Sequence, residues 1–418
     1  MNDSPTRAPG ALDPGALDAA DPLARFRDRF TLPEGIIYLD GNSLGALPKA
    51  SMERIAATVA DEWGRGLITS WNAAGWVEAP QRIGDKIARL VGAGPGEVIA
   101  CDSTSVNLFK LLTAALALNP GRATILSERG NFPTDVYMMH GIETLTRGAV
   151  RARLVDPDEI ETALDDDVAV LLLTQVHYKT GRMRDIAALT ALAHARGALV
   201  IWDLSHSAGA VPVDLTAANA DFAVGCGYKY LNGGPGAPAW LYVARRHQER
   251  VEPTLSGWFG HARPFDFTDD YQPAAGIARF LCGTPPVLGL AALECGVDLM
   301  LEADIAFLRD KSVALGELFA ARMAPLCERH GFVMASPADP AVRGSHIAYT
   351  HPAAYAIMQA LIARGVIGDF RAPVILRFGL TPLYLRFADI ERAVAILGEV
   401  MDERAWDRPE FKVRAKVT

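Results

Sequence analysis

The stretch WDLSHSAGAVPVDLTAANADFAVGCGYKYLNGGPG, residues 202–236, contains the features that decide the fold. The apolar run ALVI leads into its start, just before Asp203, and a second apolar run, DFAVG, ends shortly before Lys229. A glycine-rich loop, residues 233–236, follows the lysine. Short apolar runs bounded by polar and glycine-rich segments are typical of buried strands. We therefore expect Asp203 and Lys229 to follow two neighbouring strands.

An acid at the end of a buried strand and a lysine on a glycine-rich loop form the pair that a pyridoxal phosphate (PLP) enzyme requires. The acid keeps the pyridine nitrogen protonated, and the lysine binds the cofactor aldehyde as a Schiff base. Taken alone, the pair fits a capping aspartate and a solvated lysine equally well. Lys179, in QVHYKTG, is a competing candidate. Lys229 is favoured because the glycines around it permit close backbone approach and unusual dihedral angles.

Apolar runs and helical patterns alternate through the middle of the chain. The runs ATILSE, VRARLV, VAVLLLTQ and ALVIWD are separated by helical segments such as PDEIETAL and MRDIAALTALAHARG. This alternation predicts an α/β fold with a mostly parallel sheet covered on both faces. The runs DFAVGC and APAWLYVA follow each other without a long helix between them, so we expect one strand there to be antiparallel.

The chain is expected to divide into three segments. Residues 1–25 are rich in Pro, Ala and Asp and lack an apolar core, which predicts a flexible segment. Residues 26–300 form a large PLP-binding domain with an N-terminal arm. Residues 301–418, where helical patterns alternate with short strands, form a smaller α+β domain. The glycine-rich and aromatic segment of residues 251–286 is a long loop, and loops of this length are usually functional.

Composition and charge narrow the class of protein. The chain of 418 residues carries a net charge of -8, which argues against nucleic acid or an anionic membrane as the main partner. Its five cysteines form no paired or metal-ligand spacing, so we expect reduced thiols, no bound metal and a cytoplasmic location. The start resembles neither a signal nor a transit peptide, and no apolar run is long enough to span a bilayer.

Further polar side chains follow other predicted strands. Thr104 and Ser105 open a helix and can cradle a phosphate at its positive end, although an ordinary N-cap explains them as well. Phe132 can lie flat on a pyridine ring, and Asp135 can add negative charge near it; the alternative is a proline-containing turn capped by the aspartate. His206 can contact the phosphate or orient the nearby acid, although a lone histidine is more often structural.

Two more residues fit the chemistry of an amino-acid substrate. Arg377, in VILRFGLTPLY, can clamp an α-carboxylate with two hydrogen bonds, whereas the alternative is an ordinary surface arginine. Tyr228, beside the candidate lysine, can donate a proton or bind the phosphate, and its alternative is a packed core aromatic.

Eight motifs together closely resemble kynureninase, in the order YLDGNSLG, STSVN, FPTD, WDLSH, GYKYLNGGPG, GWFGH, CGTPP and LRFGLTPLY. The resemblance extends over residues 38–387. It implies a fold type I, PLP-dependent enzyme of the aspartate-aminotransferase fold with a mostly parallel seven-stranded sheet. It also implies hydrolysis of L-kynurenine to anthranilate and L-alanine in tryptophan catabolism, with 3-hydroxykynurenine as a possible further substrate.

The resemblance also assigns roles to individual residues. It makes Lys229 the Schiff-base lysine and Asp203 the partner of the pyridine nitrogen. It implies a homodimer in which Trp258 and Thr284 reach the cofactor of the neighbouring subunit. Some relatives carry Asn in place of Thr284, which leaves open the choice between kynurenine and its ring-hydroxylated form. The remaining implied contacts are Thr104, Ser105, Phe132, Asp135, His206 and Tyr228 to the cofactor, and Arg377, Asn42 and Ser43 to the substrate.

Two competing functions deserve comparison. A related PLP-dependent cysteine desulfurase needs a thiolate on a mobile loop, and Cys282 lies in a loop. A PLP-binding scaffold without catalysis should have lost Lys229, Asp203 or Arg377, and the chain retains all three.

Overall fold

The computed structural model describes residues 13–415, which form two compact units. The large unit consists of Leu47–Tyr178 and Arg182–Glu302. The small unit contains the described residues up to Ala46, the short segment Lys179–Gly181, and the chain from Ala303 onward. Residues 26–46, which we expected to be an arm of the large domain, therefore belong to the small unit.

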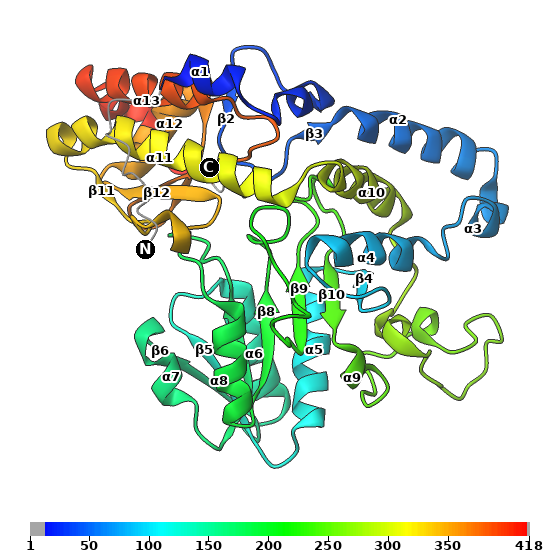
Figure 1. Cartoon of the computed structure of the whole chain (residues 1–418). Helices are drawn as coiled ribbons and strands as arrows, with labels where there is room; N and C mark the ends of the chain where they lie inside the picture. Colours follow the sequence, from blue (N-terminus) through cyan, green and yellow to red (C-terminus); the bar gives the residue numbers. More distant parts are fainter. Residues whose placement is uncertain (1–12, 416–418) are drawn as a thin grey trace, which may run out of the picture. The chain divides into compact units, whose positions relative to one another are not determined.

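A seven-stranded sheet forms the centre of the large unit (Figure 1). Its strand order is β4-β10-β9-β8-β7-β5-β6, and β10 pairs antiparallel with both of its neighbours while the other pairs are parallel. The prediction of a mostly parallel sheet with one antiparallel strand is thus confirmed. The strands are β4 (Val98–Ala100), β5 (Thr124–Glu128), β6 (Arg151–Val155), β7 (Val168–Thr174), β8 (Leu199–Asp203), β9 (Phe222–Gly225) and β10 (Trp240–Val243).

Helices cover both faces of this sheet because its central strands are apolar on both sides. Ile201 belongs to a core cluster with leucines of α5, whereas its neighbour Trp202 points the opposite way and donates to Thr190 of α8 at 3.0 Å. The helices of this unit are α2 (Lys49–Ala57), α3 (Ser70–Ala73), α4 (Ala79–Leu90), α5 (Thr104–Leu118), α6 (Pro133–Leu145), α7 (Ile160–Ala163), α8 (Ile186–Ala195), α9 (Arg245–Gln248) and α10 (Val287–Leu301).

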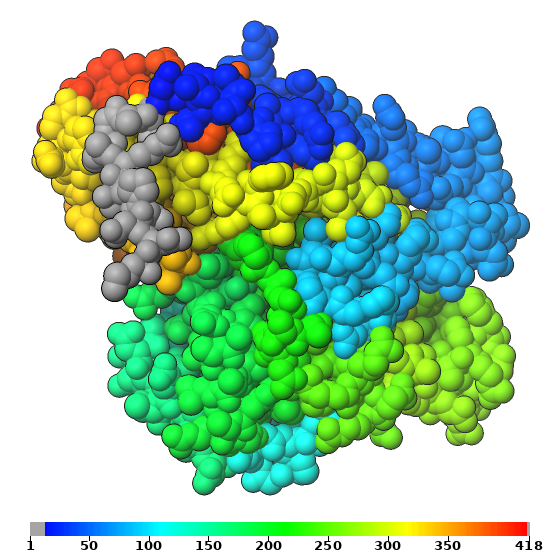
Figure 2. Space-filling view, viewed as in Figure 1, coloured from blue at the N-terminus to red at the C-terminus, as the bar shows by residue number. Residues whose placement is uncertain are grey.

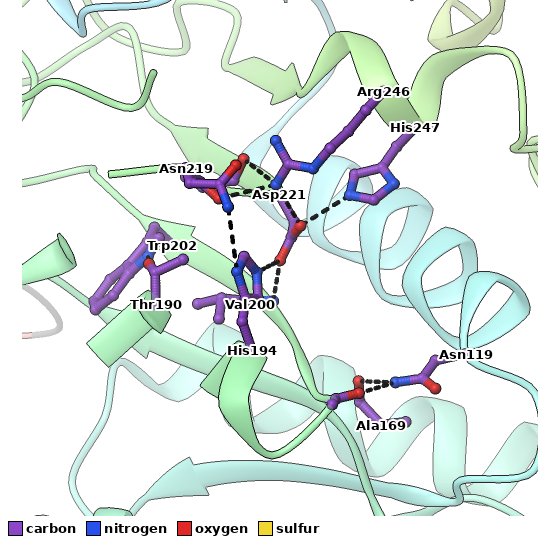
Figure 3. Close-up of polar contacts among 12 residues, drawn as sticks. Asn119, Ala169, Thr190, His194, Val200, Trp202, Asn219, Asp221, Arg246 and His247 are labelled. Carbon is purple, nitrogen blue, oxygen red and sulfur yellow. Dashed lines mark hydrogen bonds and ion pairs between the residues drawn. The ribbon is translucent and has the colours of Figure 1, made fainter. Parts of the chain in front are cut away.

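A buried carboxylate ties the helices to the amino-terminal edge of the sheet (Figure 3). Asp221, the residue just before β9, accepts hydrogen bonds from His194 of α8 at 2.7 Å and from His247 of α9 at 2.8 Å. It also accepts from the Val200 amide of β8 at 2.9 Å and pairs with Arg246 at 2.6 Å. Burial raises the pKa of Asp221, but the hydrogen bonds from the two histidines outweigh it and hold that pKa well below its usual range.

The small unit is built on an antiparallel sheet of order β11-β12-β15-β14 with three long helices. Its elements are α1 (Pro14–Ala19), β1 (Phe30–Thr31), β2 (Ile37–Tyr38), α11 (Ile305–His330), β11 (Val333–Met334), β12 (His346–Thr350), α12 (Ala354–Ala363), β13 (Val366–Ile367), β14 (Asp369–Arg371), β15 (Ile375–Gly379) and α13 (Phe387–Asp402). A further short strand, β3 (Leu47–Pro48), begins the large unit.

The segment expected to be flexible is partly structured. Residues 1–12 lie outside the described residues. From residue 13 the chain forms α1, and Asp18 accepts from the first amides of α13, Phe387 and Ala388, at 2.7 and 3.0 Å. The buried ammonium of Lys311 pairs with Asp21 at 2.6 Å. No helix within residues 13–415 combines the length and apolarity needed to cross a membrane.

Candidate active site

The sheet brings Asp203 and Lys229 together at the carboxyl-terminal edge of its strands. Asp203 is the last residue of β8, and its Oδ1 accepts from the amide of Ser205 at 2.7 Å. Burial raises its pKa above the ordinary value, against the opposing effects of Lys229 and Ser205. A buried carboxyl group within electrostatic reach of a lysine is the kind of site that perturbs proton affinity for chemistry.

Lys229 lies buried on the loop after β9. Its Nζ is 5.5 Å from the ring centre of Phe132 and 5.7 Å from that of Tyr228. The loop turns tightly, because the amide of Gly233 donates to Gly227 at 2.9 Å. A Cβ atom on Gly233 would lie 2.7 Å from that carbonyl oxygen, so the turn requires glycine there. The sequence argument that glycines allow an unusual loop around the lysine is consistent with this geometry.

Asp135 adds a second buried acid to this edge. It lies in the first turn of α6, after Phe132 and Pro133, and Thr174 Oγ1 at the end of β7 is 3.3 Å from its Oδ2. Thr174 and Asp203 are paired residues of β7 and β8. Burial and the charge of Asp203 raise the pKa of Asp135 well above its usual value. The structure therefore places both predicted acids, Lys229 and Phe132 in one cluster.

The start of α5 provides backbone donors near the same sheet edge. Ser103 is the N-cap, and its hydroxyl accepts from Val106 at 3.4 Å. This assignment leaves the hydroxyls of Thr104 and Ser105, both half-buried, free of the capping role. A helix of 15 residues presents a positive end and unbonded amides that suit a phosphate. His206, three residues beyond the end of β8, is buried, and Tyr228 is half-buried.

Trp258 and Thr284 lie together on another part of the large unit. They line a cavity of about 530 Å³ together with Ile68, Trp71, Asn72 and Phe265. The ring of Trp258 is 37% exposed and packs against Phe259 with 4.9 Å between ring centres. Figure 2 shows the surface of this region, where the light-blue segment near residue 70 lies beside the light-green segment near residue 265.

The three predicted substrate residues form a second cluster, within the small unit. Arg377, on β15, is buried and donates through Nη2 to Ser43 Oγ at 2.6 Å. With its amide oxygen turned toward the guanidinium, Asn42 accepts from Arg377 Nε at 2.9 Å. Because the side chain of Arg377 is buried, the alternative of an ordinary surface arginine is excluded. The carboxylate clamp stays a prediction.

Sequence reasoning missed Asp369, which is the principal partner of this arginine. Its Oδ1 accepts from Arg377 Nε at 2.9 Å, its Oδ2 pairs with Arg377 Nη2, and Ser43 donates to it at 2.8 Å. Arg371 also pairs with Asp369 at 2.7 Å. Asp40 is a second acid within electrostatic reach of both arginines, so the cluster contains two arginines and two aspartates. No motif identifies Asp369, because its role depends on the pairing of β14 with β15.

The thiol that a desulfurase would need is poorly suited to nucleophilic attack. Burial raises the pKa of Cys282, although Lys110 opposes this effect. Its Sγ donates to the Leu255 carbonyl at 3.0 Å. A thiol rather than a thiolate is therefore favoured at this position.

Comparison with solved structures identifies the fold. The fold is similar to a cysteine desulfurase from Thermococcus onnurineus NA1, with a TM-score of 0.76, 18% identity, and coverage of 91% of this chain and 98% of that one. The cysteine desulfurase CsdA of Escherichia coli gives a TM-score of 0.75 at 19% identity, again over 91% and 98%. A C-DES variant with glycine linked to its PLP cofactor gives 0.74 at 17% identity, over 89% and 99%. This chain has the fold of type I PLP-dependent enzymes.

Comparison of sequences identifies the family. Residues 308–397 match the kynureninase C-terminal domain. A kynureninase from Pseudomonas fluorescens is 52% identical over 408 residues, which cover 96% of this chain and 98% of the relative. One from Burkholderia pseudomallei (strain 1106a) is 50% identical over the same shares. The chain belongs to the kynureninase family, and its cofactor is PLP.

Proposed function

We propose that this enzyme hydrolyses L-kynurenine to anthranilate and L-alanine, with 3-hydroxykynurenine as a further substrate. The observation that carries the proposal is the cluster of the buried Asp203, Asp135 and Lys229 with the half-buried Phe132 in a chain that is 52% identical to a kynureninase. When bound, PLP supplies an electron sink for negative charge that develops beside the substrate amine. The cluster fits this group, because it combines a lysine, an aromatic face and acids beyond the sheet edge.

Each residue of the large unit then has a defined task. Asp203 holds a proton on the pyridine nitrogen, and Phe132 packs against the ring. Lys229 anchors the cofactor, and its released amine removes and returns the proton at the substrate Cα. Tyr228 assists proton transfer when water adds to the γ-carbonyl and the Cβ–Cγ bond breaks. Thr104, Ser105 and His206 bind the phosphate.

The small unit supplies the carboxylate site. Arg377 binds the α-carboxylate of the substrate, and Asn42 and Ser43 orient its guanidinium. This role is supported by the second arginine, Arg371, which shares Asp369 with Arg377 and adds a second guanidinium to the cluster. An anionic carboxylate buried beside a guanidinium is stabilised by charge-assisted hydrogen bonds.

The enzyme is proposed to act as a homodimer in which Trp258 and Thr284 complete the neighbouring site. Large apolar side chains around their cavity are exposed, including Ile68 at 76% and Phe267 at 76%. Exposed apolar surface of this extent is typical of an interface. Phe265, which lines the same cavity, is also exposed.

Anthranilate fluorescence tests the activity directly. Purified protein saturated with PLP should release anthranilate from L-kynurenine, and Lys229→Ala should abolish this release. The matched control is Lys179→Ala, the competing lysine, which should still bind PLP covalently. L-Cysteine with dithiothreitol distinguishes a desulfurase, because such an enzyme would form alanine and a persulfide, which the dithiol reduces to free sulfide, without anthranilate. Wild-type turnover by Lys229→Ala, or release of sulfide without anthranilate, would contradict the proposal.

A mixing experiment tests the shared site. Lys229→Ala and Trp258→Ala proteins should each be impaired alone. After subunit exchange, a mixed dimer holds one site with both native residues, so about a quarter of the wild-type activity should return. If Trp258 served the cofactor of its own subunit, mixing would restore nothing.

A further inference from the structure

The direction of the hydrogen bonds around Asp135 can be assigned, because two of the donors are known: the backbone amide of Phe132 and the side-chain NH2 group of Asn131. The amide of Phe132 donates to Asn131 Oδ1 at 2.7 Å, and a backbone N–H can only donate. This contact identifies Oδ1 as the oxygen of the Asn131 amide. The other end of that amide, Nδ2, donates to Ser127 Oγ at 3.1 Å, and Ser127 donates onward to the Leu172 carbonyl at 2.7 Å.

The hydroxyl of Thr174 has only one proton, and it uses this proton to donate a hydrogen bond to Asn131. Thr174 Oγ1 is 2.5 Å from Asn131 Oδ1, an oxygen that can only accept. Thr174 therefore faces Asp135 with lone pairs alone. Asp135 Oδ2 is 3.3 Å from Thr174 Oγ1. If this carboxylate were ionised, two oxygen atoms would face each other without a proton between them, which is a repulsive contact. A protonated carboxyl group satisfies the contact by donating to the hydroxyl.

We propose that Asp135 is a neutral carboxylic acid in the working enzyme, held so by Thr174 and Asn131 as positioning residues, and that Asp203 alone supplies the negative charge at the cofactor ring. The part that concerns the ring rests on the proposed function. The proposal replaces our expectation that Asp135 adds negative charge near the ring. A single anion then pairs with the single positive charge of the protonated pyridine.

The surroundings of Asp135 agree with this assignment. Its side chain is buried, and its Oδ1 has no hydrogen-bond partner among the described residues. Burial, followed by the charge of Asp203, raises its pKa well above the usual value, and the charge of Lys229 opposes the shift. Two nearby carboxyl groups in a buried site cannot both ionise without a large penalty. Asp203 keeps its charge more readily, because the Ser205 amide donates to it.

Infrared absorption of the PLP-loaded enzyme tests the proposal, because the carbonyl stretch of a protonated acid is separate from that of a carboxylate. An aspartic acid with the ordinary pKa of about 3.9 is protonated in roughly one molecule per thousand near pH 7. The wild type should show a protonated-acid band at neutral pH. Asp135→Asn should remove it, and Asp203→Asn should retain it.

Asp40→Asn is the matched control. Burial and the charge of Asp369 raise the pKa of Asp40 to about 7, so Asp40→Asn should remove its own part of the acid absorption near neutral pH and leave that of Asp135. The proposal would be overturned if Asp135→Asn lost a band of an ionised carboxylate and kept the band of the protonated acid.

Thr174 variants provide a second measurement if Asp135→Asn does not fold. Thr174→Val removes the acceptor and should shift the acid band, whereas Thr174→Ser should restore its position. An unshifted band in Thr174→Val would refute the positioning role. The infrared result can be distinguished from the result of the kynurenine assay. An enzyme that shows the acid band but releases no anthranilate would refute only the proposed function.

Discussion

Removing the charge of Asp221 should destabilise the enzyme without touching its active site. Asp221 directly precedes β9, whereas Asp203 ends the parallel strand β8, so the two acids occupy opposite edges of the sheet. In Asp221→Asn an amide group must face either the pair His194 and Val200 or the pair His247 and Arg246. All four groups donate hydrogen bonds to the native carboxylate. In the variant, the amide NH2 therefore faces one pair of these donors and cannot accept their hydrogen bonds.

The magnitude follows from the burial of this carboxylate, whose side chain is 1% exposed. Disrupting a buried, charged network costs about 3–5 kcal/mol, and hydrogen bonds to a charged group contribute about 1.5–3 kcal/mol each. We expect the free energy of unfolding to fall by about 3–5 kcal/mol, measured by urea denaturation at neutral pH. Asp158→Asn, a change at an exposed aspartate, is the control and should alter stability by less than about 0.5 kcal/mol.

The pH dependence gives a second check on the same residue. The folded-state pKa of Asp221 lies below its unfolded value, so its contribution is fully present above the unfolded pKa of about 3.9. It is lost as the pH falls toward the folded pKa. The stability difference between wild type and Asp221→Asn should therefore shrink below about pH 4. A difference under about 1 kcal/mol at neutral pH, or one that grows in acid, would refute the reasoning.

Three further outcomes are expected. Arg377→Lys should raise the KM for kynurenine by about tenfold or more, because an ammonium cannot bind a carboxylate in two parallel hydrogen bonds; an unchanged KM in steady-state kinetics would contradict the clamp. Gly233→Ala should weaken PLP binding, followed by cofactor absorbance, because its Cβ would lie 2.7 Å from the Gly227 oxygen, whereas Gly283→Ala meets no atom within 4 Å and should not. Burial raises the pKa of Glu294, but Arg82 and Lys86 lower it to about 2, so Glu294→Gln should lose about 1–2 kcal/mol in urea denaturation at neutral pH and progressively less below about pH 4.

Local sequence patterns predicted much of the large unit. The apolar runs before Asp203 and Lys229 are β8 and β9, and the absence of a long helix after β9 correctly indicated the antiparallel β10. These features depend on neighbouring residues, which is why they can be read along the chain. Resemblance to a family then supplied the reaction, which periodicity alone does not contain.

Long-range pairing decided the rest. Residues 26–46 group with the small unit because they pack against residues that lie far along the chain, as the bond of Arg27 to Asp389 at 2.8 Å illustrates. Asp369 becomes the partner of Arg377 only when β14 pairs with β15.

The opening stretch, residues 202–236, shows the same division. Its order of apolar runs, acid, lysine and glycines determined that one end of the sheet would hold an acid and a lysine. The protonation of Asp135 depends on Asn131 and Thr174, 43 residues apart, because the direction of a hydrogen bond is set by the donors that folding brings together. A sequence specifies which groups can donate, and only the tertiary structure decides which acceptor receives each proton.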